Sequence, residues 1–133
     1  MRVLAVDYGD RRTGLAFSDL CGEAFTVEEW DPEHLAGRIA DECRTRGAGR
    51  IVLGLPKNMD GTEGPRAEKS RAFAELLRER TGLEVRLWDE RRSSVEAHAI
   101  LSANGKREKK HKKNVDALAA ALILESYLGS AHI

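Results

Sequence analysis

Residues 3–10 read Val-Leu-Ala-Val-Asp-Tyr-Gly-Asp, an apolar run that ends on a carboxylate and then turns at a glycine. A run this short, stopped by a turn, predicts a buried central strand. Asp7 would then lie at the end of that strand, where open sheets with parallel strands usually place their ligands. Aspartate is also common in turns that have no function, so Asp7 alone leaves both interpretations open.

The pattern that follows predicts a mixed α/β sheet in a single domain, residues 1–133. Alternating apolar runs and turns predict strands at residues 2–7, 13–19, 23–28, 51–53 and 85–88. Amphipathic spacing and cap residues predict helices at residues 31–47, 65–80, 93–101 and 115–128. This order indicates a five-stranded sheet, with a three-strand antiparallel meander, further parallel strands, and helices on both faces.

Charge is balanced overall but uneven along the chain. Lys plus Arg total 22 and Asp plus Glu total 22, so no global field attracts nucleic acid or membrane. Residues 106–113 carry six basic side chains and one acidic, a net +5, which leaves −5 on the other 125 residues. Cys21 and Cys43 lack any paired or metal-ligand spacing and are expected to be buried, reduced thiols. With no leader and no apolar stretch near 18 residues, we expect a soluble cytoplasmic protein.

Carboxylates mark the site that this topology predicts. Asp7, residues 56–60 and the pair Asp89-Glu90 all follow strands, and such strand ends should converge at one edge of the sheet. Asp116 precedes eight apolar residues, 117–124, which must lie against the sheet. Aspartate is also favoured in a first helical turn, by about 0.3–1 kcal/mol, without any further role. Carboxylates brought together repel each other, and a hard cation such as Mg²⁺ relieves that repulsion.

Four motifs together resemble the YqgF (RuvX) family. They are Val-Asp-Tyr-Gly with Arg12-x-Gly-x-Ala-x-Ser-Asp, residues 54–66 (Gly-Leu-Pro-x-Asn-Met-Asp-Gly-Thr-Glu-Gly-Pro-Arg), Asp-Glu-Arg at 89–91, and Val-Asp-x-x-Ala-Ala at 115–120. The family is described as pre-16S ribosomal RNA nucleases and as Holliday junction resolvase-like, with an RNase H-like fold. The resemblance implies that Asp7, Glu90 and Asp116 are the catalytic residues and hold divalent metal, Mg²⁺ or Mn²⁺. Arg92-Ser93-Ser94 replaces the family's usual Leu-Ser/Thr-Thr, which keeps the acidic residues and adds a charge.

Adjacent strand residues face opposite sides, so Asp89 stays an alternative to Glu90 as ligand, and we favour Glu90. Carboxylate-held metal can activate water and neutralise phosphate, so hydrolysis needs no side-chain nucleophile. Cationic and polar side chains near these strand ends are the predicted substrate contacts. They are Arg12, Asn58, Arg66, Arg91, Lys109, Lys110, Lys112 and Lys113. A solvated loop at 106–113 and a plain strand-to-helix connection at 58–66 are the alternatives for these segments.

The predicted function is metal-dependent hydrolysis of phosphodiester bonds in 5′-end processing of pre-16S ribosomal RNA. Cleavage of four-way DNA as a Holliday junction resolvase and a noncatalytic nucleic-acid-binding module are the alternatives. The Asp7-Tyr8-Gly9 turn also resembles that of actin-like ATPases and sugar kinases, but those need two such lobes. Aromatic residues make up only 5% of the chain, which argues against base stacking and favours structured RNA or branched DNA, including pre-ribosomal particles. Monomer and homodimer both remain open, and no membrane partner is expected.

Overall fold

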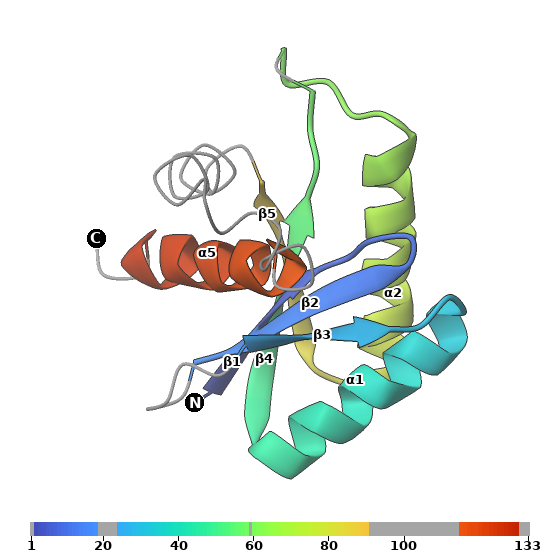
Figure 1. The fold of residues 1–133 in the computed structure, drawn as a ribbon, viewed down its shortest axis with the longest axis vertical. Coiled ribbons are helices and arrows are strands. Elements are labelled where there is room, and N and C mark those ends of the chain that lie inside the picture. Colours follow the sequence, from blue (N-terminus) through green and yellow to red (C-terminus); the bar gives the residue numbers. More distant parts are fainter. Residues whose placement is uncertain (1, 19–23, 59, 91–114, 131–133) are drawn as a thin grey trace.

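A computed structural model describes residues 2–18, 24–58, 60–90 and 115–130 of the chain (Figure 1). The strands are β1 (Arg2–Asp7), β2 (Arg12–Phe17), β3 (Ala24–Glu28), β4 (Ala48–Leu55) and β5 (Glu84–Asp89). The helices are α1 (Pro32–Arg46), α2 (Pro65–Thr81) and α5 (Val115–Ser130). The helix predicted at 93–101 and the basic segment 106–113 lie outside the described residues.

The sheet has five strands in the order β3-β2-β1-β4-β5. β1 pairs antiparallel with β2, and β2 pairs antiparallel with β3, which makes the predicted meander. β1 pairs parallel with β4, and β4 pairs parallel with β5. The mixed sheet is therefore confirmed, and its central strand β1 ends at Asp7.

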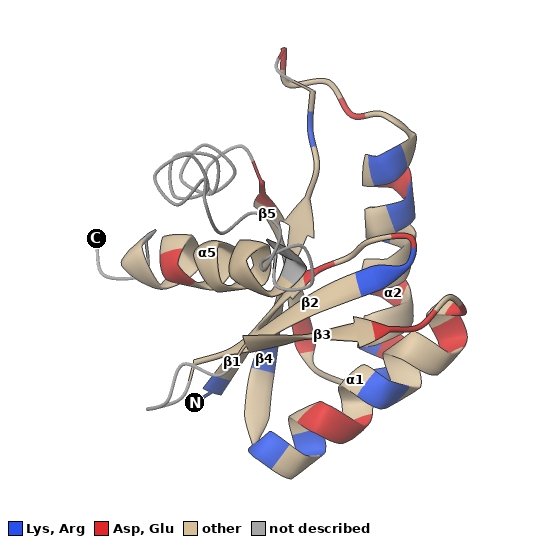
Figure 2. Cartoon of the chain, in the orientation of Figure 1, with Lys and Arg blue, Asp and Glu red and all other residues tan. Residues whose placement is uncertain are grey.

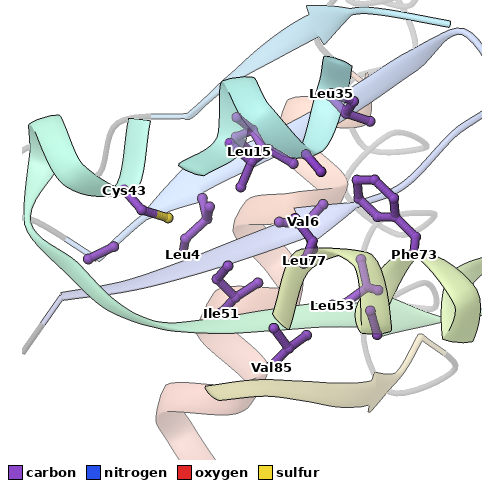
Figure 3. Close-up of a cluster of buried hydrophobic side chains, with 14 of the residues drawn as sticks. Leu4, Val6, Leu15, Leu35, Cys43, Ile51, Leu53, Phe73, Leu77 and Val85 are labelled. Carbon is purple, nitrogen blue, oxygen red and sulfur yellow. The ribbon is translucent and has the colours of Figure 1, made fainter. Parts of the chain in front are cut away.

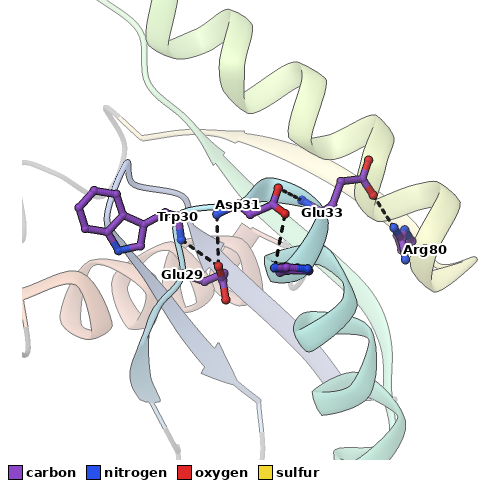
Figure 4. Close-up of polar contacts among 6 residues, drawn as sticks. Glu29, Trp30, Asp31, Glu33 and Arg80 are labelled. Atoms are coloured by element: carbon purple, nitrogen blue, oxygen red, sulfur yellow. Dashed lines mark hydrogen bonds and ion pairs between the residues drawn. The ribbon is translucent and has the colours of Figure 1, made fainter.

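Local signals in the sequence explain where the helices begin and end. The Asp31 side chain accepts a hydrogen bond from the Glu33 backbone N–H, at 3.2 Å, and Pro32 occupies the first turn of α1 (Figure 4). Gly47 then ends α1 in the left-handed region, with φ of 71°, which glycine adopts without steric cost. An ion pair between Glu33 and Arg80 joins the start of α1 to the last turn of α2 (Figure 4).

Helices cover both faces of the sheet, as predicted. α1 and α2 cover one face, where a cluster of large aliphatic side chains is buried, among them Leu4, Leu53 and Leu77 (Figure 3). α5 covers the other face, where the buried cluster includes Ala5, Val52 and Ala120. Charged residues follow α1 and α2 but are sparse along α5 (Figure 2). An apolar helix with so few charges fits a position against the centre of the sheet.

Two smaller predictions can be compared with the structure. β4 is longer than the three-residue core predicted for it, since pairing with β1 and β5 extends it over Ala48–Leu55. Cys43 is a buried free thiol, as expected, and burial raises its pKa to about 11. Cys21 lies outside the described residues. No helix in the described part of the chain is long and apolar enough to cross a membrane.

Candidate active site

Asp7 lies at the carboxyl end of the central strand. Side chains alternate along β1, with Leu4 and Val6 in the cluster under α1 and α2, and Val3 and Ala5 in the cluster under α5. Asp7 continues the second series, so its carboxylate belongs to the face that α5 covers. β2 and β4 flank β1 on either side. The Asp7 carboxylate therefore lies at the end of the middle strand of the sheet, not at the end of an outer strand.

Glu90 reaches Asp7 from the end of the neighbouring parallel strands. Its backbone N–H donates to the Leu55 carbonyl at 3.1 Å, which extends the pairing of β5 with β4 by one residue. Its side chain is hydrogen-bonded to that of Asp7. Asp89, by contrast, is the last residue of β5 and lies opposite Leu55 in the register. The carboxylate that meets Asp7 is therefore that of Glu90.

Gly54 makes room for this contact. A Cβ atom at Gly54 would lie 2.6 Å from Glu90 Oε1 and 2.8 Å from Ile123 Cδ1, which is closer than real Cβ contacts come. The Glu90 carboxylate thus lies directly against the backbone of β4, next to a side chain of α5. This role of Gly54 was not predicted from the sequence, although a glycine within an otherwise apolar strand is a known signal of close approach.

Burial raises the pKa of both carboxyl groups, while the hydrogen bond between them lowers the pKa of Asp7 and raises that of Glu90. Desolvation is the main cause for Asp7, whose pKa is raised above its usual range. Desolvation, followed by the neighbouring Asp7, raises the pKa of Glu90 to about 8. Arg66, in the first turn of α2, acts in the opposite direction on both groups. Without a cation the pair therefore holds a proton near neutral pH.

This donor set suits a divalent cation. Two partly buried carboxyl groups in hydrogen-bond contact offer oxygen ligands of the kind that Mg²⁺ and Mn²⁺ prefer, and a cation would replace the shared proton. Among the residues that the structure describes, no group of three His, Cys, Asp or Glu side chains could hold a metal ion. The side chain of Asp116 lies outside that description, so the predicted third carboxylate stays a prediction.

The direction of α5 brings its first turn toward the acidic pair. Near its far end, the Tyr127 hydroxyl accepts a hydrogen bond at 2.7 Å from Arg50, close to the start of β4. Ile123, one turn earlier, lies beside Gly54, close to the end of β4. The two contacts follow in opposite order along α5 and β4, so the backbone of residue 116, about 10 Å further along the helix, lies toward the carboxyl ends of the strands.

The other predicted substrate contacts differ in how close they lie to the acidic pair and in which contacts they make. Arg66 is exposed and close enough to affect the pKa of both carboxyl groups. Asn58 is exposed, and its side-chain amide donates to Thr62 Oγ1 at 2.9 Å, so it also shapes its own loop. Arg12 pairs across the strands with Glu28 of β3, at 3.3 Å, a contact that was not predicted from the sequence. Arg91, Lys109, Lys110, Lys112 and Lys113 lie outside the described residues.

Comparison with known structures identifies the fold class. The chain is similar to Thermus thermophilus RuvC in complex with a Holliday junction substrate, with a TM-score of 0.63 over 98% of this chain and 96% of that one. Their sequences are 14% identical, so this likeness shows the fold, which is RNase H-like as predicted.

The sequence identifies the family. The profile of the family described as "RuvX: Holliday junction resolvase" matches residues 1–130, and the chain belongs to this family. A relative from Pelotomaculum thermopropionicum is 41% identical, over 98% of this chain and 88% of its own length. A relative from Bacillus licheniformis is 40% identical, over 98% of both chains. Both of these relatives bear the name "Putative pre-16S rRNA nuclease".

Proposed function

We propose that the protein is a nuclease that hydrolyses phosphodiester bonds with Mg²⁺ or Mn²⁺ held by Asp7, Glu90 and Asp116. The observation that carries this proposal is the hydrogen-bonded Asp7–Glu90 pair at the carboxyl end of the central strands, with both pKa values raised by burial. A module that only bound nucleic acid would gain nothing from uncompensated carboxyl groups in contact, since they repel phosphate. A site that takes up a cation does gain from them.

Each residue has a separate part in this proposal. Asp7 and Glu90 would hold the cation, and Gly54 lets the Glu90 carboxylate lie against β4. A cation bound there would supply an activated water and neutralise charge on the phosphate. Arg66 attracts the phosphate backbone to this end of the sheet, because its positive charge lies close enough to lower the pKa of both carboxyl groups. No side-chain nucleophile is required for this reaction.

The proposed substrate is the 5′ end of pre-16S ribosomal RNA. Support comes from relatives about 40% identical over nearly the full chain, whose printed name specifies pre-16S rRNA. The protein would then act in the cytoplasm on pre-ribosomal particles. Lys109, Lys110, Lys112 and Lys113, with Arg12, Asn58 and Arg91, are the proposed further contacts to the nucleic-acid backbone. Neutralising the four lysines should lower the slope of log affinity against log salt by up to about 0.7 per lost contact on single strands.

Parallel cleavage assays test the proposal. The purified protein is given an RNA that carries the 16S precursor 5′ extension and, separately, a four-way DNA junction, each in Mg²⁺, in Mn²⁺ and in EDTA. We expect metal-dependent cleavage of the RNA by the wild type and almost none by Asp7→Asn. Cleavage in EDTA, or full activity of Asp7→Asn, would contradict the proposed site.

Junction cleavage is the second candidate, because the family description names a Holliday junction resolvase. A resolvase would be expected to place two sites on opposing strands, and therefore to act as a two-fold symmetric dimer. Preference for the junction in the same assay, together with a dimer in light scattering, would favour this candidate. A kinase-like role instead requires ATP binding, so we expect calorimetric titration with ATP and Mg²⁺ to show no saturable binding.

A further inference from the structure

A second feature, a hollow of about 360 Å³, opens on the other face of the sheet, beside the turn that follows Asp7. Three separate segments form it: the turn after β1, the connection from β3 into α1, and the middle of α2. Its lining includes Tyr8, Asp10, Trp30, Lys69, Phe73 and Leu76. Pockets of this size bind small flat molecules when they combine apolar walls with a few polar groups.

Aromatic rings dominate the walls of the hollow. Trp30 is 70% exposed, and it is the large hydrophobic side chain that stands out as exposed within the described ranges. The Arg11 guanidinium lies 5.2 Å from the centre of the Trp30 ring, a cation–π distance. Tyr8 and Phe73 are stacked with ring centres 4.1 Å apart and an interplanar angle of 7°. The hollow therefore has a wall made of the buried Phe73 and the partly buried Tyr8, and an exposed indole beside a cation. Figure 4 shows Trp30 projecting away from the α1 cap.

Two segments of the chain connect the hollow with the acidic pair. Tyr8 directly follows Asp7, and side chains alternate there, so one residue faces the carboxylates while the next faces the hollow. Along α2, Arg66, Lys69 and Phe73 follow at spacings of three and four residues and share one side of the helix. A nucleic-acid strand whose phosphate lies at Arg66 would thus be led by Lys69 toward the aromatic wall.

The charges of the hollow favour a base over a phosphate. The Asp10 carboxylate belongs to the lining and lies 3.6 Å from the Lys69 ammonium. A carboxylate repels phosphate but accepts hydrogen bonds from the amino groups of adenine, cytosine or guanine. Lys69 and Arg11 at the same time suit the flanking backbone. Aromatic rings beside cations are the combination with which proteins hold unpaired bases.

We propose that this hollow binds one unpaired nucleobase of the nucleic-acid substrate, stacked on Trp30, while the adjoining phosphates lie along Lys69 and Arg66. This inference rests on the proposed nuclease function, since it assumes a nucleic-acid substrate. It adds a preference for substrates with an unpaired nucleotide near the bond to be cut. The low aromatic content of the chain argues against stacking of many bases, but the single exposed indole of Trp30 is sufficient to stack on one base.

Binding measurements in the Asp7→Asn background, where cleavage should not interfere, test the inference. The probes are an RNA hairpin with a four-nucleotide single-stranded tail and the same hairpin with a blunt end. Trp30→Ala should weaken binding of the tailed hairpin by about 5- to 150-fold, the range expected for one stacked base, and leave the blunt hairpin almost unchanged. Trp30→Phe should restore most of the affinity, because it retains a ring. Arg44→Ala, which removes an exposed cation at the opposite end of α1, is the matched control and should bind as the parent does.

Tryptophan emission provides a second readout, because the chain has two tryptophans. With Trp88→Phe, the remaining Trp30 should be quenched by the tailed hairpin. With Trp30→Phe, the remaining Trp88, which is hydrogen-bonded to Ser126, should change little. Equal affinity of Trp30→Ala and its parent for the tailed hairpin, or an equal loss on both hairpins, would overturn the inference alone. If the parent protein bound neither hairpin, both the proposed function and this inference would be contradicted.

Discussion

The two faces of the sheet differ in the size of the side chains they bury. The face under α1 and α2 is filled by large residues, such as Leu15, Phe17 and Leu53. The face under α5 uses Ala5, Ala16 and Ala120 at its centre, and Gly54 beside Glu90. Small residues let a helix approach the strands closely. The first face thus mainly stabilises the fold, and the second allows carboxyl groups to be packed against backbone.

Among the tests of this comparison, replacing either carboxyl group by its amide should have the largest effect. Asp7→Asn and Glu90→Gln should each lower the cleavage rate by more than the roughly 10–100-fold that is typical for groups that only support a metal ligand, since each removes a charge that would hold the cation. Stability should hold or rise in the metal-free protein, because a neutral amide avoids the desolvation cost of a buried carboxylate. Asp89→Asn is the matched control and should keep most of the activity, since Glu90 is the residue that meets Asp7. A larger loss in Asp89→Asn than in Glu90→Gln would reverse the assignment.

Truncation on the opposite face should act on stability instead. Leu53 is fully buried in the cluster under α1 and α2, so Leu53→Ala should lower the free energy of unfolding by about 2–5 kcal/mol. The pH dependence of metal binding should stay as in the wild type. Urea unfolding and calorimetric metal titration measure the two quantities. A change in metal affinity greater than the change produced by Gly54→Ala would show that the two faces are not separable.

Gly54→Ala should affect both stability and activity. Its methyl group would meet Glu90 Oε1 and Ile123, so the overpacking should cost about 1–3 kcal/mol and displace the carboxylate. Gly37→Ala is the matched control, because nothing lies within 4 Å of a Cβ atom at that position in α1. It should stabilise the protein by about 0.4–1 kcal/mol and leave cleavage unchanged. Equal behaviour of the two variants would mean that Gly54 is not needed for close approach.

A further prediction concerns pH. The pKa of Glu90 is raised from an ordinary value of 4.5 to about 8, so its protonated form is favoured in the folded state. This contribution to stability is fully present below pH 4.5 and is lost as the pH rises through about 8. In EDTA, the wild type should therefore lose more stability than Glu90→Gln between pH 6 and pH 9, measured by urea unfolding. Parallel curves for the two proteins would argue against the raised pKa.

The sequence predicted which carboxylates lie at the strand ends better than it predicted how closely other side chains pack around them. Asp7 and Glu90 could be placed at one edge because each follows a short apolar run, and parallel strands end together. The role of Gly54 depends on how closely Glu90 and Ile123 approach it, which spacing along the chain does not reveal. The hollow beside Trp30 likewise depends on three segments that meet only in the folded chain. The role of Asp116 and that of the basic segment remain predictions.

The position of α5 in the chain bears on the order of assembly during synthesis. α5 follows all five strands, yet it packs on β1 and β2, which are made first. Because α5 is the last of these elements to be synthesised, all five strands can emerge while one face of the sheet is still in contact with water. Until α5 docks, the Asp7 and Glu90 carboxyl groups would stay solvated, with pKa values closer to those of free side chains. Docking of this helix, rather than strand pairing, would then give the acidic pair its affinity for protons and cations.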